Sequence, residues 1–274
     1  MTQAELLLIV LSAVTGVCGY LLLLYQYRLR RLNYKQQEIP AFAGISFLIS
    51  GTMIYGAEWH AQGLACGTAA AYLLVVLAFG LLGVADDLYG DRTVGGFKGH
   101  FRLLRSGKVS TGVIKAVVGG ASALAAGFLM SYPLWVHMLV AAALVALTAN
   151  FMNLLDVRPG RSLFASLVAG GLLTVYLALT GNGNLGFLFY VALSAMLVLY
   201  PLDAWGLIMI GDTGANVFGA LVGLSAAMWL PIYIQLLIIT CLVMFHIWAE
   251  KNSFSKYIAS NKALRTFDSK IGIR

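Results

Sequence analysis

The feature that most constrains this chain is a series of apolar runs that are nearly free of charge. Helices of about 20 apolar residues cross the hydrocarbon core of a bilayer, and most of this chain consists of such stretches. Of the 274 residues, 60% are hydrophobic and 11% are charged, whereas soluble domains carry about 25% charged residues. Mean hydropathy is +0.86. The sequence therefore predicts an all-α, polytopic integral membrane protein and excludes an ordinary soluble fold.

Charged residues, prolines and glycines divide the chain into nine predicted transmembrane helices within one membrane domain, residues 1–274. The helices are expected over residues 4–26, 41–57, 63–85, 111–131, 134–155, 162–180, 185–201, 214–230 and 232–249. Short, nearly neutral connections alternate with longer ones, which lie near residues 27–40, 86–110, 156–161 and 202–213, and a tail follows over 250–274.

Positive charge is confined to one side of this arrangement. All 18 Lys and Arg residues fall in the longer connections, in the tail or, for Lys115, one turn inside a helix that begins there. The positive-inside rule therefore predicts a cytoplasmic C-terminus and an outside N-terminus. The net charge of +7 suits lipid headgroups and phosphates. Because a basic face is expected of any membrane protein, nucleic acid is not predicted as a partner.

The apolar runs carry no Asp, Glu, Lys or Arg near the middle of any predicted helix. Charges at that depth are costly and usually mark an ion or substrate path. Their absence argues against a proton-coupled transporter or an ion channel. The polar chemistry is instead expected at the cytoplasmic membrane surface.

Adjacent carboxylates end the third predicted helix. The stretch "LLGVADDLYGDR" contains Asp86 and Asp87, and Lys98 and His100 follow. Neighbouring like charges raise each other's pKa unless a cation or hydrogen-bond donors intervene. Solvation beyond the end of the apolar run is the simplest explanation; a bound cation is the alternative.

Further polar groups recur at other cytoplasmic helix ends. In "NFMNLLDVRPGR", Asn150, Asn153 and Asp156 follow one another at three-residue spacing, which places them on one helix face. In "MIGDTGANVFGALVG", Asp212 and Thr213 open the eighth predicted helix. The flanking glycines, Gly211 and Gly214, would allow close approach of a ligand to a helix N-terminus, which attracts anions.

Each motif has a purely structural explanation when taken singly. The "GDTG" stretch is typical of a helix cap, the two amides could join helices, and the tail has the pattern of an interfacial amphipathic helix. Taken together, carboxylates, amides, glycines and cations on one membrane face favour a site for a divalent cation and phosphates. Mg²⁺ prefers oxygen ligands from one or two carboxylates shared with substrate phosphates.

Four motifs in order resemble the polyprenyl-phosphate N-acetylhexosamine-1-phosphate transferases, a superfamily that includes the phospho-N-acetylmuramoyl-pentapeptide translocase of peptidoglycan synthesis. The motifs are "EIPAFAG", "DD", "NFMNLLD" and "IGDTGA", and they span residues 38–215. The resemblance implies transfer of a sugar 1-phosphate from a UDP-sugar to undecaprenyl phosphate or a similar lipid, with release of UMP. It also implies a bacterial plasma membrane, an active site on the cytoplasmic face, contact with membrane lipid and a homodimer.

The resemblance assigns roles to particular residues. Asp212 matches the family's magnesium-associated aspartate, and Asp86 and Asp87 match the aspartate pair; these three are the expected ligands of Mg²⁺, with Mn²⁺ as the alternative ion. Asp156, together with Asp86, Asp87 and Asp212, completes the expected catalytic set. The expected substrate-binding set adds the amides, the cationic phosphate clamps and the turn residues: Asn150, Asn153, Lys98, His100, Lys115, Arg158, Arg161, Gly211 and Thr213. For the cations, the positive-inside pattern is an equally good explanation.

The chain departs from the family pattern in three places. The family's usual D-G-x-D-G run is here "DVRPG", so that Pro159 replaces an aspartate. The late histidine cluster is missing, with only His246 nearby, and the chain has nine predicted helices where many relatives have ten or eleven. These departures indicate a divergent branch.

Two other functions fit parts of the sequence. A polyprenyl-phosphate binder or flippase without chemistry would need the cytoplasmic cluster only to hold a phosphate headgroup. The CDP-alcohol phosphotransferases also cluster aspartates around a metal, but their D-G-x-x-A-R signature is absent here.

Overall fold

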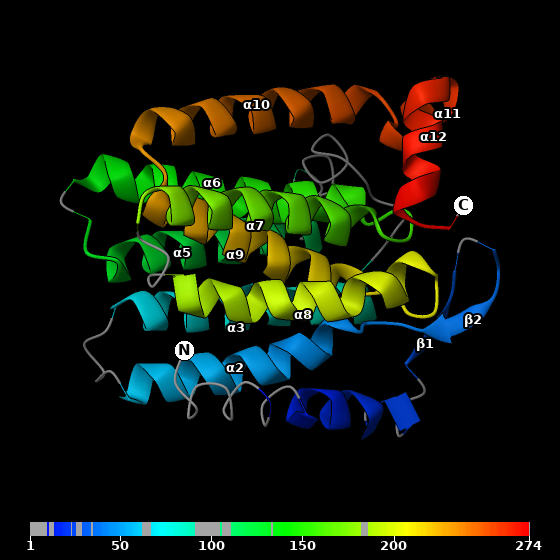
Figure 1. The fold of residues 1–274 in the computed structure, drawn as a ribbon, viewed down its shortest axis with the longest axis horizontal. Coiled ribbons are helices and arrows are strands. Elements are labelled where there is room, and N and C mark those ends of the chain that lie inside the picture. The colour runs from blue at the N-terminus through cyan, green and yellow to red at the C-terminus, as the bar shows by residue number, and fades with distance from the viewer. Residues whose placement is uncertain are drawn as a thin grey trace.

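The computed structural model describes residues 10, 14–22, 24–25, 29–33, 35–61, 67–90, 105, 111–132, 134–181 and 186–273. Long helices lie side by side along one axis (Figure 1). In chain order they are α2 (Gly44–Ala61), α3 (Gly67–Tyr89), α5 (Thr111–Leu129), α6 (Trp135–Leu155), α7 (Arg161–Leu179), α8 (Phe187–Ala204), α9 (Gly211–Trp229) and α10 (Ile232–Lys251). Residues 14–22 of the first predicted helix are also helical.

The predicted all-α fold with membrane-length helices is confirmed, whereas the count of nine transmembrane helices and the orientation of the termini stay predictions. Among the described residues, five helices are long and apolar enough to cross a membrane: α3, α6, α7, α8 and α10. Many of their large apolar side chains are exposed on the outside of the bundle, including Leu172 and Val198. Such exposure would be costly in water and is expected of helices that face lipid tails.

Helix α9 is the core of the bundle and packs against α2, α3, α6, α7 and α8. Every residue of it from 213 to 227 is buried. Because its neighbours, rather than lipid, surround it, α9 tolerates Gly, Ser, Thr and Asn. Small residues let α6 approach closely: a Cβ added at Gly223 would lie 2.7 Å from the Leu144 carbonyl oxygen, and one at Gly219 would lie 2.6 Å from that of Thr148.

We call one end of the bundle the polar end: α3, α6, α8 and α10 end there, and α2, α5, α7 and α9 begin there (Figure 1). A short antiparallel hairpin of β1 (Arg30–Leu32) and β2 (Glu38–Pro40) precedes α2 at this end. The chain after β2 is joined to the start of α9, because Met209 N–H donates to the Pro40 carbonyl at 2.9 Å and Gly44 N–H donates to the Ile210 carbonyl at 3.0 Å.

The tail forms two short helices, α11 (Phe254–Ser260) and α12 (Lys262–Ile271), which cross the polar end at a steep angle to the bundle axis (Figure 1). Ser253 caps α11, and Asn261 caps α12 by accepting from Leu264 N–H at 3.1 Å. The buried residues of α12 are Asp268 and Ile271, whereas most of its remaining side chains are exposed. The predicted amphipathic tail helix therefore lies against the protein itself.

Several helix ends differ from the prediction in ways that matter for the site. Helix α3 continues to Tyr89, so Asp86 and Asp87 belong to its last turn. Helix α9 begins at Gly211, which puts Asp212 in its first turn. Helix α8 continues through Pro201 to Ala204 and carries Asp203 inward. These polar residues interrupt the apolar pattern, but they lie within helices, where Asp87 and Asp203 find partners at the starts of α9 and α7.

The close contact between α6 and α9 generates a stability prediction. Gly223→Ala should lower the stability of the protein by about 1–3 kcal/mol, because the added methyl group overlaps the α6 backbone. The matched control is Gly171→Ala in α7, where an added Cβ meets nothing within 4 Å; helix propensity makes this change neutral or favourable by up to about 1 kcal/mol. Thermal unfolding in detergent measures both. A Gly223→Ala midpoint at or above the wild-type value would contradict the packing.

Candidate functional site

The Asp87 side chain in α3 caps the first turn of α9. Its Oδ1 accepts from Asp212 N–H at 2.9 Å, and its Oδ2 accepts from Thr213 N–H at 3.0 Å and from the Thr213 hydroxyl at 2.7 Å. The first amides of a helix lack partners within the helix, and the helix dipole favours negative charge beside them. Asp87 satisfies both requirements from a different helix.

Two glycines make room for this cap. Gly211 has a φ of +70°, which favours glycine, and a Cβ there would lie 2.7 Å from Asp87 Oδ2. On α3, a Cβ at Gly83 would lie 2.7 Å from the Asp212 carbonyl oxygen. The glycine before Asp212 in "IGDTGA" and the one four residues before Asp87 therefore let the carboxylate reach the α9 backbone.

The Asp212 side chain connects α9 to α6. Asn153 Nδ2 donates to Asp212 Oδ2 at 3.3 Å, and both residues are partly buried. Asn153 lies in the last turn of α6, three residues before Asp156. Thus the structure brings together predicted residues from the "DD", "NFMNLLD" and "IGDTGA" motifs.

Asp156, directly after the last residue of α6, shares the electrostatic environment of these carboxylates. Burial raises its pKa well above the ordinary value, and the negative charges of Asp203, Asp212 and Asp87 raise it further. Four carboxylates from the ends of α3, α6 and α8 and the start of α9 therefore act on one another. Such a concentration of negative charge favours binding of a cation.

Asp203, near the end of the predicted helix 185–201, is not among the residues that the sequence predicts for the site. It is 3% exposed, and its Oδ2 accepts from Gly160 N–H at 2.8 Å. Gly160, with a φ of +81°, precedes α7. Asp203 thus joins the last turn of α8 to the turn between α6 and α7. An aspartate after an apolar run gives no local signal for such a distant partner.

Arg161, a predicted phosphate clamp, has a carboxylate partner in this structure. Its Nε donates to Asp268 Oδ1 at 2.7 Å and its Nη2 to Asp268 Oδ2 at 2.8 Å, while its Nη1 donates to Ser255 Oγ at 2.9 Å. A phosphate group would have to displace these partners. The clamp role of Arg161 therefore stays a prediction. Asp268 was absent from the predicted site, although it is the only acidic residue between 251 and 274.

The other predicted residues occupy varied positions. Asp86 is partly buried, and its carboxylate lies against Gly90, where an added Cβ would be 2.9 Å from Oδ1. Asn150 is exposed on α6, and Arg158 is partly buried in the turn before α7. Lys98, His100 and the side chain of Lys115 lie outside the described residues.

The donor set fits a magnesium site that is completed by substrate. Within the described ranges, no group of three or more His, Cys, Asp or Glu residues is arranged to hold a metal ion by itself. Mg²⁺ usually takes one or two carboxylates together with substrate phosphates and water. The mutually repelling carboxylates around Asp212 fit that requirement, and Asn153 holds one oxygen of Asp212.

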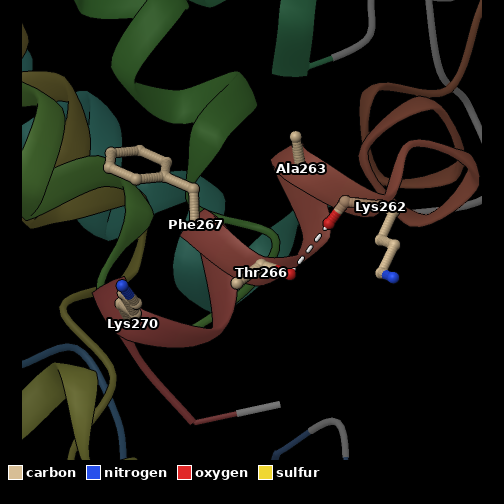
Figure 2. Close-up of a pocket in the computed structure, with 5 residues that line it drawn as sticks. All are labelled: Lys262, Ala263, Thr266, Phe267 and Lys270. Atoms are coloured by element: carbon tan, nitrogen blue, oxygen red, sulfur yellow. Dashed lines mark hydrogen bonds between the residues drawn. The ribbon is translucent and has the colours of Figure 1, made fainter.

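A shallow pocket of about 570 Å³ lies on α12, and none of the predicted site residues lines it. Figure 2 shows its lining: Lys262, Ala263, Thr266, Phe267 and Lys270. The Thr266 hydroxyl donates to the Lys262 carbonyl at 2.9 Å. The lining contains no carboxylate and comes from a single helix, so the pocket does not have the chemistry of the site around Asp212.

Comparison with known proteins finds no matching family model and no similar curated protein.

The cap on α9 predicts an effect of Asp87 on stability that is separate from any activity. Asp87→Ala should lower the free energy of unfolding by about 1–3 kcal/mol, because it leaves buried donors of α9 without their acceptor. Asp87→Asn should lose less, since the amide oxygen still accepts. Thermal unfolding in detergent compares the two variants. Equal midpoints for wild type and Asp87→Ala would contradict the capping role.

The raised pKa of Asp156 predicts how its replacement changes stability with pH. The folded protein holds the Asp156 proton more tightly than the unfolded chain does. As pH rises above 3.8, the ordinary pKa of an aspartate, this residue therefore lowers the free energy of unfolding. Asp156→Asn removes this effect and should raise the unfolding midpoint at neutral pH, with the gain disappearing in acid. Midpoints from pH 4 to 8, without divalent cations, provide the test. A less stable variant at pH 7 would contradict it.

Proposed function

We propose that this protein transfers a sugar 1-phosphate from a UDP-sugar to a polyprenyl phosphate, with release of UMP, in a Mg²⁺-dependent reaction. The observation that best supports this proposal is the convergence of Asp87, Asn153, Asp156 and Asp212 at the polar end. These residues come from three motifs shared with the polyprenyl-phosphate transferases. Oxygen ligands beside a helix start suit a diphosphate with its divalent cation.

The residues that would hold Mg²⁺ are Asp212 and one of the Asp86–Asp87 pair. Of this pair, Asp87 lies at the start of α9, where it accepts three hydrogen bonds from Asp212 and Thr213. When bound, the ion would neutralise charge on the donor diphosphate and on the phosphoryl group during transfer.

The protein's own groups would position the reactants. Asp87 fixes the start of α9, and Asn153 orients the Asp212 carboxylate. Phosphoryl transfer depends mainly on positioning and electrostatics. Since the second pKa of a phosphate monoester is about 6, the lipid phosphate is largely deprotonated at neutral pH and needs little help from a base. We therefore assign Asp86 and Asp156 binding and positioning roles ahead of proton transfer.

In this proposal the polar end faces the cytoplasm of a bacterial cell, and the protein spans the plasma membrane nine times with its N-terminus outside. The supporting observation is the distribution of charge: the helix ends and the tail at the polar end carry Arg158, Arg161, Lys251 and the cations of α11 and α12. Lys and Arg concentrate on the cytoplasmic side of membrane proteins. That side is also where nucleotide sugars are available.

The proposal predicts that Asp212→Asn lowers UMP release by at least about 10²-fold, comparable to the loss of a preorganised electrostatic group in other enzymes. The assay combines purified protein, undecaprenyl phosphate, Mg²⁺ and, in separate reactions, UDP-GlcNAc, UDP-GalNAc or UDP-MurNAc-pentapeptide. The control is Glu58→Gln, an equivalent change at the opposite end of α2 from the polar end. An unchanged unfolding midpoint would show that the Asp212 variant remains folded.

Two outcomes would count against the proposal. Turnover retained in Asp212→Asn would reject this site. No UMP release from any donor by the wild-type protein, combined with tight binding of undecaprenyl phosphate, would favour the polyprenyl-phosphate binder or flippase. In the second case, loss of lipid binding in Asp212→Asn would still assign the polar end as the headgroup site.

A further inference from the structure

The tail is attached to the candidate site by a buried ion pair. Arg161 and Asp268 are 6% and 5% exposed, and two parallel hydrogen bonds of 2.7 and 2.8 Å join them. Ser255 accepts a third hydrogen bond from the guanidinium group, whose central carbon lies 5.8 Å from the centre of the Phe254 ring. Two parallel bonds fix the direction as well as the distance of the partner.

Further contacts hold the end of α12 in place. The Tyr200 hydroxyl donates to the Ile271 carbonyl at 2.9 Å, and Ile273 N–H donates to the Ala204 carbonyl at 2.8 Å. A Cβ added at Gly272 would overlap the Pro159 carbonyl. We call residues 158–161, 200–206 and 254–273 together the tail clamp.

Within the tail clamp, residues of α8 and of the tail contact the turn that follows Asp156. Gly160 N–H donates to Asp203, and a Cβ at Gly160 would lie 2.6 Å from the Ile271 carbonyl oxygen. The turn is therefore held by α8 on one side and by the tail on the other. Only the four residues 157–160 separate Asp156 from Arg161, so the position of Arg161 restricts where Asp156 can lie.

We propose that Asp268 is a positioning residue for the candidate site: by holding Arg161, it fixes the turn at 156–161 and keeps Asp156 beside the start of α9. The effect on catalysis rests on the proposed function, whereas the effect on the turn does not. This assigns a role to the tail that the family resemblance, which ends at residue 215, does not reach.

The buried pair supplies geometry more than stability. Well-packed apolar residues stabilise a protein at least as well as a buried ion pair does, whereas loss of one partner leaves an uncompensated buried charge. Asp268 does not line the pocket on α12, whose lining residues Lys262, Thr266 and Lys270 follow one another at four-residue spacing (Figure 2). Changes on the pocket face therefore provide controls.

Hydrogen–deuterium exchange of the full-length protein in detergent tests the clamp without substrate. Asp268→Asn should speed amide exchange in the turn at 156–161, including the Gly160 amide, and leave α2 unchanged. The control is Lys262→Gln, at an exposed position on the pocket face of the same helix, which should leave the exchange of the turn as in the wild type. Equal exchange of the turn in the wild type and in Asp268→Asn would overturn the proposal.

A double variant separates loss of tail docking from the effect of an uncompensated buried charge. Arg161→Met combined with Asp268→Leu replaces the pair by apolar side chains and leaves no buried charge. Protection of the turn should recover above that of Asp268→Asn, because the tail can dock again. A double variant that exchanges as fast as Asp268→Asn would show that docking of the tail does not hold the turn.

Turnover distinguishes a positioning role from a purely structural one. Asp268→Asn should lower kcat by roughly 10²-fold, the size of effect expected when a reacting group is misplaced by about 1 Å, with the KM for lipid unchanged. A loosened turn with wild-type kcat would overturn the positioning role. If the wild type releases no UMP while amide exchange in the turn is still faster in Asp268→Asn, the proposed function is rejected. The role of Asp268 in fixing the turn is then retained.

Discussion

The structure depends on the capping of α9 by Asp87. Helix α9 is the central helix of the bundle, and its first amides would be without partners in a crowded interior if α3 did not supply a carboxylate. The same contact sets the position of α3 relative to α9 and leaves the Asp212 side chain to be oriented by Asn153 on α6. One carboxylate therefore organises both the packing of the core and the geometry of the candidate site.

Negative charge at the polar end is balanced in different ways. The partners of Asp87 are helix amides and a hydroxyl, that of Asp203 is a turn amide, and that of Asp268 is Arg161. Around Asp156, by contrast, the nearby carboxylates raise its pKa. In the proposed function, a cation and phosphates would bind around Asp156 and Asp212, whose carboxylates lie close enough to affect one another.

The sequence predicted the helices well because each apolar run has the length of a bilayer-crossing helix, and this signal is local. Helix ends were predicted less well. The predicted helices end at residue 85 and begin at residue 214, yet Asp86 and Thr213 lie within helices, because a polar residue at a helix end can find its partner on another helix. Arg161 and Asp268 illustrate the same limit. Each is consistent with a solvated cytoplasmic charge, and only docking of the tail makes them a buried pair.

By itself the sequence determined an all-α protein with membrane-length helices, with its charge at the helix ends and with carboxylates and amides grouped in short motifs. These properties follow from composition and spacing along the chain. The tertiary structure decided which aspartate caps a helix, which one faces an amide and which one pairs with an arginine. The physical reason is that such partners lie far apart in the chain, 125 residues in the case of Asp87 and Asp212. They meet only when each helix has a particular rotation about its axis and a particular position along it, and no local sequence pattern encodes either.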